Sequence, residues 1–131
     1  MPKVKSFTRV RDAEHIISEA EGRRSREQIM LAAAAFTGVD FLKPGTVLGQ
    51  ITATKLYVPH DPAAATGAEV AKAFLYARAE PAGAGVNVRA VGHVRDCEVN
   101  GKKIFWKAGI TGPEKATAEA ALATNGALVR Y

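Results

Sequence analysis

The stretch LKPGTVLGQITAT, residues 42–54, carries the clearest structural signals in the chain. Pro44-Gly45 is the residue pair of a type II turn, because proline presets φ at the second turn position and glycine tolerates a positive φ at the third. Residues 46–54 behind the turn are rich in β-branched side chains, and Val47 and Ile51 fall on one face of an extended strand. The stretch therefore predicts a turn that leads into a strand with one buried face.

Further strand patterns follow this stretch toward the C-terminus. Val70–Tyr76 is typical of a buried strand, and Val86–Val99 alternates apolar with polar side chains, which places His93 on the polar face. Asn100-Gly101 is a strong hairpin signal and predicts that the chain returns along this strand through residues 104–106.

One helix is well marked near the C-terminus. Thr111 and Glu114 form a capping-box pattern around Pro113, and the helix that they begin should run to about Thr124. Asn125-Gly126 then favours a left-handed stop. The apolar residues 128 and 129 that follow predict a closing strand.

Residues 27–35 are compatible with two structures. Ile29–Leu31 is apolar enough for a strand, but Ser25 followed by Gln28 also fits a capping box that begins a short helix. The pattern does not decide between them. The fold class that follows is mainly β with one or two short helices, with an α+β tendency.

The composition describes one ordinary globular domain rather than a specialised one. The chain has 131 residues, 47% of them hydrophobic, and a net charge of +5. A positive balance favours anionic partners, but this excess is small for a dedicated nucleic-acid binder, and acidic residues are interspersed. The longest apolar run, Ile29–Phe36, is far too short to span a bilayer, so no membrane partner is expected.

The residue types that carry chemistry are few and scattered. A single cysteine, Cys97, excludes an intrachain disulfide and a multi-thiolate zinc site, and its strand context indicates a small buried apolar residue. The three histidines, His15, His60 and His93, lack metal-ligand spacing. Glycine-rich phosphate loops and nucleophile motifs are absent from the sequence. We therefore expect no metal, no cofactor and no enzymatic activity.

The first 28 residues differ from the rest of the chain. They contain seven Lys or Arg and five Asp or Glu, with few large apolar residues. Such a segment buries too little apolar surface to offset the entropy of ordering by itself. Either it is a frayed terminus or it is an arm that becomes ordered on a partner, and the pattern leaves both readings open.

When its segments are compared in their order along the chain, the sequence resembles the lambda-type bacteriophage head decoration proteins. The resemblance covers most of residues 15–130, and its strongest part is the stretch from Leu42 to Thr54. Other segments agree in order and spacing, namely His15–Ala20, Ser25–Glu27, Tyr57, Asp61–Ala64, Gly67–Ala71, Val94–Asn100 and Ala121–Arg130. The chain departs from the family pattern at residues 33–40 and in the loop at residues 83–85.

The resemblance implies a compact single domain of the β-clip kind that forms homotrimers at three-fold and quasi-three-fold sites on the outside of an expanded capsid. The implied partner is the major capsid protein of the same phage, with no specific nucleic acid and no membrane. The protein would be made in the host cytoplasm, join the virion, and stabilise the head against internal DNA pressure.

The resemblance also implies a role for the N-terminal segment, since the family's arm adds a strand to the capsid protein. We expect an extended capsid-binding arm in residues 1–24 and a decoration domain in residues 25–131. An extended arm of ~20 residues spans at most roughly 65–70 Å, and strand addition would supply affinity. Deletion of residues 1–20 should then leave a folded domain. The expected binding residues are Lys5, Phe7, Arg9, Val10, Ile16, Ile17, Arg23 and Arg24.

Two other functions are compatible with the residues alone. A small basic nucleic-acid-binding β domain is favoured by the charge and by the arginine cluster at residues 23–26. A small hydrolase or lyase would use His60 or His93 and would require a concave pocket with perturbed carboxylates beside either ring.

Overall fold

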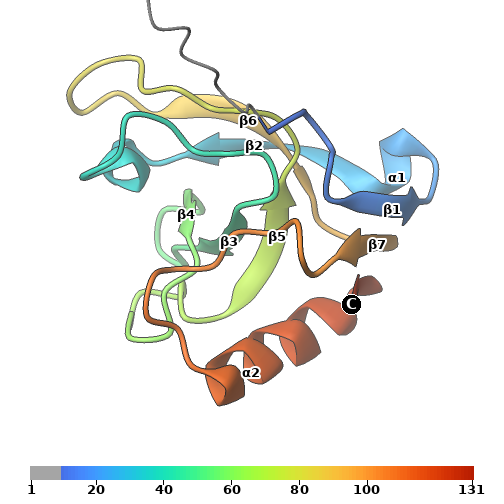
Figure 1. Ribbon diagram of the computed structural model, residues 1–131. Helices are drawn as coiled ribbons and strands as arrows, with labels where there is room; N and C mark the ends of the chain where they lie inside the picture. The colour runs from blue at the N-terminus through green and yellow to red at the C-terminus, as the bar shows by residue number, and fades with distance from the viewer. Residues whose placement is uncertain (1–9) are drawn as a thin grey trace, which may run out of the picture.

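The computed structural model describes residues 10–131, except for the side chains at positions 22 and 23. Figure 1 shows a mainly β molecule with one long helix at its base, which confirms the predicted fold class. The elements in chain order are β1 (Ile16–Glu19), α1 (Gly22–Ser25), β2 (Arg26–Leu31), the 3-10 helix η1 (Ala33–Phe36), β3 (Val47–Gln50), β4 (Tyr57–Pro59), β5 (Ala71–Leu75), β6 (Val88–His93), β7 (Cys97–Asn100), α2 (Gly112–Ala123) and β8 (Ala127–Arg130).

The strands form a closed barrel and a small second sheet. The barrel order is β2-β4-β3-β5-β6, and β6 pairs with β2 over six residues to close it. The second sheet has the order β1-β7-β8, with β1 antiparallel and β8 parallel to β7. Because β6 and β7 are consecutive, the chain passes directly from the barrel into the second sheet.

The turn at residues 43–46 forms as predicted. The Thr46 amide donates to the Lys43 carbonyl at 3.2 Å, and Gly45 has φ of +88°. A Cβ at Gly45 would also lie 2.8 Å from the Lys103 carbonyl oxygen and 3.3 Å from the His15 side chain. Glycine is therefore required here both for the dihedral angle and for the close approach of two other segments.

The strand after this turn is shorter than the sequence predicts. β3 ends at Gln50, because the Lys55 amide donates to the Ile51 carbonyl and the Ile51 amide to the Leu56 carbonyl in a tight turn. The chain then returns as β4, antiparallel to β3, a strand that the sequence analysis did not assign.

Residues 27–35, for which the sequence was compatible with a strand or a short helix, contain both: the strand β2 and the 3-10 helix η1. β2 is a strand because its whole length pairs with β6, which buries Ile29 and Leu31 and leaves Met30 exposed. η1 follows at once, and the Ala33 amide at its start donates to the Asn87 side chain.

The single strand predicted for Val86–Val99 is divided in two. Its second half pairs in another sheet, and the break contains Asp96 with φ of +48°. Val86 is 46% exposed, and His93, predicted on the polar face, is 0% exposed. The alternation fails at His93 because the end of β6 lies where the barrel meets the small sheet, so it has no solvent side.

The hairpin predicted at Asn100-Gly101 is wrong. A turn does form, since the Asn100 carbonyl accepts from the Lys103 amide and the Asn100 side chain accepts from the Lys102 amide. The chain does not return along β7, because β1 and β8 already pair with its two edges. Phe105 instead makes an isolated parallel bridge with Thr46.

The C-terminal elements agree with the prediction. Thr111 and Glu114 form the complete capping box of α2, Gly126 ends the helix with φ of +78°, and β8 follows. No helix among residues 10–131 is long and apolar enough to cross a membrane.

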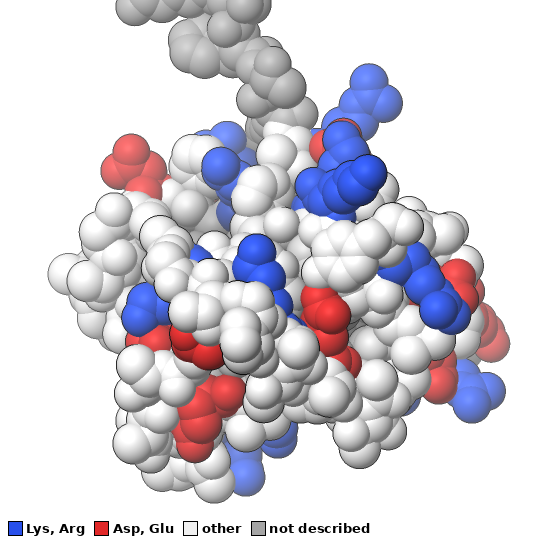
Figure 2. Space-filling view, turned by 60° about the horizontal axis from the view of Figure 1, so that its bottom comes forward, with Lys and Arg blue, Asp and Glu red and all other residues white. Residues whose placement is uncertain are grey.

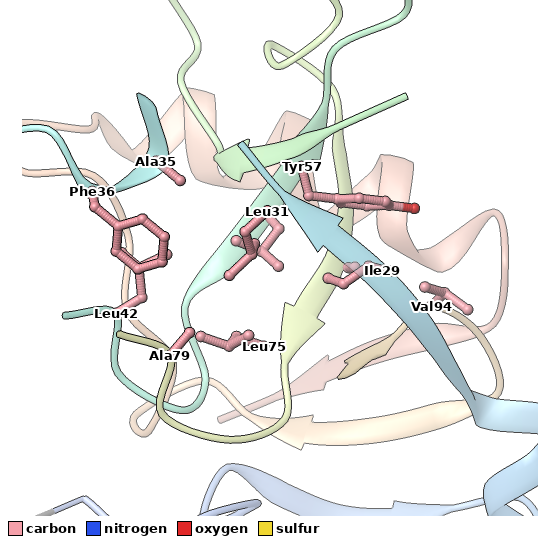
Figure 3. Close-up of a cluster of buried hydrophobic side chains, with 11 residues drawn as sticks. Ile29, Leu31, Ala35, Phe36, Leu42, Tyr57, Leu75, Ala79 and Val94 are labelled. Carbon is pink, nitrogen blue, oxygen red and sulfur yellow. The ribbon is translucent and has the colours of Figure 1, made fainter. Parts of the chain in front are cut away.

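Two clusters of buried side chains hold these elements together. One fills the barrel, and Figure 3 shows Leu31 of β2 in its middle, between Phe36 and Leu42 on one side and Ile29 on the other. The second joins the barrel to α2 and the small sheet through residues such as Phe74, Val99 and Leu122. The small sheet is therefore part of the same folded unit as the barrel.

Candidate functional site

The expected binding residues do not converge in a single pocket. Val10 is partly buried ahead of β1, while Ile16 packs against the second core cluster. Ile17 is 53% exposed on β1, and Arg24 is exposed in α1. Three of the expected residues lie outside the described residues, namely Lys5, Phe7 and Arg9. The side chain of Arg23 is not described either.

Residues 13–20 are attached to the domain, although the sequence analysis assigned them to the arm. The Ala13 amide donates to the Tyr76 carbonyl at 2.9 Å, and the His15 carbonyl accepts from the Asn100 amide at 2.7 Å. β1 then pairs with β7, with a register shift between Ile16 and Ser18. The attachment follows from tertiary structure, because β7 offers an edge that the local sequence of residues 13–20 does not reveal.

A polar cluster fastens β1 to the barrel. We call it the β1 polar cluster; its members are His15, Glu19, Ser25, Arg26 and His93. The two histidine rings are 1% and 0% exposed and meet edge to face, with centroids 5.5 Å apart. No local pattern predicts this pair, since 78 positions separate residues 15 and 93.

Glu19 is the centre of the β1 polar cluster. Its Oε2 lies 2.9 Å from His93 Nε2 and accepts from Ser25 Oγ at 2.8 Å, and its carboxylate also pairs with Arg26. The Arg26 guanidinium in turn lies over the Tyr76 ring, 4.4 Å from its centroid. One carboxylate therefore connects β1 to α1, β2 and β6.

The surroundings of the histidines favour their neutral forms. Burial lowers the pKa of His15 to about 4, and the nearby His93 acts in the same direction. Burial also lowers the pKa of His93, although Glu19 opposes this. For Glu19, burial raises the pKa, but hydrogen bonds from Arg26 and Ser25 outweigh it, so that the pKa lies below its ordinary value. At neutral pH the environment of the β1 polar cluster therefore favours neutral histidines and an ionised Glu19.

The arginines of the predicted basic cluster have acidic partners where the structure describes them. Arg24 Nε lies 2.8 Å from Asp96 with its side chain 71% exposed, and Arg26 pairs with Glu19. On the face shown in Figure 2, lysine and arginine side chains are dispersed among acidic and uncharged ones. The cluster that suggested the nucleic-acid alternative therefore has acidic partners at Arg24 and Arg26, rather than cations free for phosphates.

The two arginines should differ in their effect on stability. Arg26→Ala is expected to lower the free energy of unfolding by about 1–3 kcal/mol, because it removes charge-assisted hydrogen bonds to Glu19 and the contact with Tyr76. Arg24→Ala, the matched control, should cost only ~0.2–1 kcal/mol because its ion pair is exposed. Urea denaturation of both variants checks this. Equal losses would show that the β1 polar cluster adds nothing beyond a surface pair.

The two rings that the hydrolase alternative would use, those of His60 and His93, are both buried. Cys97, which this alternative does not use, is buried as the sequence predicts, and burial raises the pKa of its thiol to about 11. His93 is fully enclosed. His60 Nε2 lies 3.0 Å from the Glu69 carbonyl oxygen, and a hydrogen bond from Lys107 holds the pKa of the adjacent Asp61 below its usual range. Among residues 10–131, no three or more His, Cys, Asp or Glu residues are grouped to hold a metal ion.

One surface feature escaped the sequence analysis altogether. An apolar cavity of about 410 Å³ lies between the loop before β3, the end of β4 and the segment after β7. We call it the aromatic groove. Its lining includes Val39, Phe41, Lys43, His60, Phe105 and Trp106. The aromatic residues come from segments more than 60 positions apart, so no local pattern announces the groove.

Comparison with known proteins gives one result. A family model described as bacteriophage lambda head decoration protein D matches residues 8–127 of the chain. No curated protein sequence matches it. The match includes the barrel, α2 and the strands β1 and β7 of the small sheet, together with the segment that precedes β1, and it ends at the first residue of β8.

Proposed function

This chain belongs to the family of the bacteriophage lambda head decoration protein D, and from that premise we propose that it binds as a homotrimer at three-fold and quasi-three-fold sites on the outside of the expanded head. As a member of this family it is a structural protein of the virion that binds the capsid, and it is not an enzyme. The proposed result of binding is a head that withstands the pressure of the packaged DNA, because each trimer links neighbouring capsid subunits.

The observation that carries the binding mode is the position of β1. It lies at the edge of the small sheet, paired with β7 on one side, and Ile17 on it is 53% exposed. The chain preceding β1 therefore starts from a firmly held strand at the molecular surface. A segment held in this way is well placed to add a strand to a sheet of the capsid protein.

The proposed binding residues follow the chain along this edge. Residues 1–12 supply the reach, with Phe7 and Val10 as apolar contacts and Lys5 and Arg9 as cations. At the domain, Ile17 is available on β1, whereas Ile16 supports the strand from the core side. Arg23 and Arg24 would add charge where α1 meets the capsid. We therefore propose an arm that ends ahead of residue 13 rather than at residue 24, because residues 13–20 bond to the domain.

Trimer formation makes weak contacts sufficient. An exposed ion pair contributes only ~0.2–1 kcal/mol, so one arm by itself would bind weakly. Three arms held in one trimer act at a high effective concentration, which raises the overall affinity without new contacts. The same argument explains why the capsid rather than a free capsid subunit would be the preferred partner.

Sedimentation with expanded, undecorated heads of the parent phage tests the proposal. The protein should sediment with the heads, saturate at three copies per three-fold or quasi-three-fold site, and raise the temperature at which DNA-filled heads burst. Binding should not occur on unexpanded heads, since the proposal is specific to the expanded form. A protein that stays in the supernatant, or that instead binds duplex DNA with a steep salt dependence, would contradict the proposal.

A further inference from the structure

The aromatic groove combines apolar walls with a cationic margin. Phe41, Phe105 and Trp106 are half-buried, and Val39 is 46% exposed at the edge. Lys43 Nζ lies 4.8 Å from the centroid of the Phe105 ring. Half-buried aromatic rings in a concave site supply large contact areas at little entropic cost, which is the composition of a recognition surface.

The charges at the groove are not balanced. Arg78 stacks on Phe41 at 3.7 Å and pairs with Glu80, and Lys107 pairs with Asp61 at 2.8 Å. Within the part of the chain that the structure describes, Lys43 makes no ion pair. Among the residues that line the groove, Lys43 is therefore a cation without an ion pair beside the aromatic walls, which suits a carboxylate on the occupant.

The lining of the groove also contains an unpaired polar atom. His60 is 3% exposed, and its Nε2 lies 3.0 Å from the Glu69 carbonyl oxygen, so this nitrogen carries the hydrogen. Nδ1 is then an acceptor, and it has no hydrogen-bond partner among residues 10–131. A buried acceptor without a partner is costly to the folded protein.

The groove is continuous with the place where the N-terminal segment joins the domain. The Arg78 amide donates to the Asp12 carboxylate at 3.4 Å, and the Arg78 guanidinium lies over Phe41 in the groove wall. Leu42 and Ala79 form an antiparallel bridge between the same two segments. The root of the arm and the aromatic groove thus form one surface.

We propose that the aromatic groove receives an acidic, apolar segment of the major capsid protein, and that this second contact fixes the orientation of the domain on the head. The proposal rests on the proposed function, because it takes the partner of the neighbouring arm to be the capsid. The groove's cation disfavours the chain's own N-terminal segment as the occupant, since that segment carries Lys3, Lys5 and Arg9.

The test is a charge and polarity change at the exposed margin. The variant V39D/K43E makes the groove edge acidic at two exposed positions, so the fold should be retained. The matched control V86D/K102E makes the same changes at exposed positions outside the groove, where Val86 is also 46% exposed. Affinity for expanded, undecorated heads is measured at low and high salt, with the thermal unfolding midpoint and the sedimentation coefficient of each free protein.

We expect V39D/K43E to bind heads at least about tenfold more weakly than wild type, with the difference shrinking at high salt, while the control binds like wild type. If the groove variant also binds like wild type, the groove inference is overturned and the proposed function stands. If wild type itself does not bind heads, both the proposed function and the groove inference are contradicted.

Two further outcomes are distinguishable. A groove variant that loses self-association, while wild type and control retain it, would make the occupant a second copy of this chain and overturn the capsid assignment. If the double variant has a lowered unfolding midpoint, Lys43→Glu alone is compared with Lys102→Glu. A loss of head binding by the first and not the second supports the inference, and equal binding overturns it.

Discussion

Deletion of residues 1–20 is expected to lower the free energy of unfolding by about 3–5 kcal/mol, whereas deletion of residues 1–9 should leave it unchanged and abolish retention on heads. The longer deletion removes β1 and the buried His15, and it takes Glu19 away from Arg26 and His93. Removing one partner of a partly buried charged pair has a cost of this size. The shorter deletion removes only residues that precede the described core, so its effect falls on binding.

This expectation reverses the one drawn from the sequence, in which residues 1–20 were dispensable for folding. Urea denaturation followed by circular dichroism measures both stabilities, and sedimentation with expanded heads measures retention. The two deletions are each other's control, because the longer one contains the shorter. A Δ1–20 protein as stable as wild type would show that the β1 polar cluster is peripheral. A Δ1–9 protein that still binds heads would place capsid recognition in the domain alone.

The protein is also expected to lose stability steeply between pH 6.5 and pH 4. The folded-state pKa of His15 is lowered from 6.5 to about 4, so the unfolded chain binds a proton that the folded one does not. The stabilisation is complete above pH 6.5 and is lost as the pH falls toward 4. A shift of this size corresponds to about 3 kcal/mol, and the lowered pKa values of His93 and Glu19 act in the same direction.

His15→Leu provides the matched comparison. Neither ring nitrogen of His15 has a hydrogen-bond partner among the described residues, so leucine removes the titration without removing a bond. Thermal unfolding midpoints of wild type and variant, measured from pH 8 to pH 4, should diverge below pH 6.5, with the variant falling less. Parallel curves would exclude His15 as the source of the acid sensitivity. Because His15 lies directly before β1, acid should also weaken binding to heads in wild type more than in the variant.

Several elements were predictable because their causes are local. The Pro44-Gly45 turn depends on the dihedral preferences of two adjacent residues, and the α2 capping box on side chains three positions apart. Gly126 ends α2 for a similarly local reason. The mainly β fold class followed from alternation along single strands, and the burial of Cys97 followed from its place in one of them.

The errors came from partners that lie far away in the chain. Asn100-Gly101 has the composition of a hairpin turn, but both edges of β7 are already taken by β1 and β8. His93 has the position of a polar-face residue, but the strand leaves the barrel there and both of its sides are covered. Neither fact can be read from the neighbouring residues, because each depends on which strand arrives from elsewhere.

The difference between local contacts and contacts between distant segments also explains which features of the arm and the groove could be predicted. The sequence by itself determined the Pro44-Gly45 turn, the C-terminal helix, the mainly β class and the charged character of the N-terminal segment, because these depend on contacts within a few residues. Only the tertiary structure decided that β1 pairs with β7, that the His15 ring packs against His93, which contacts Glu19, and that Phe41 and Trp106 share one groove. Those features arise when closure of the barrel brings distant segments together, and their energies exist only once that closure has occurred.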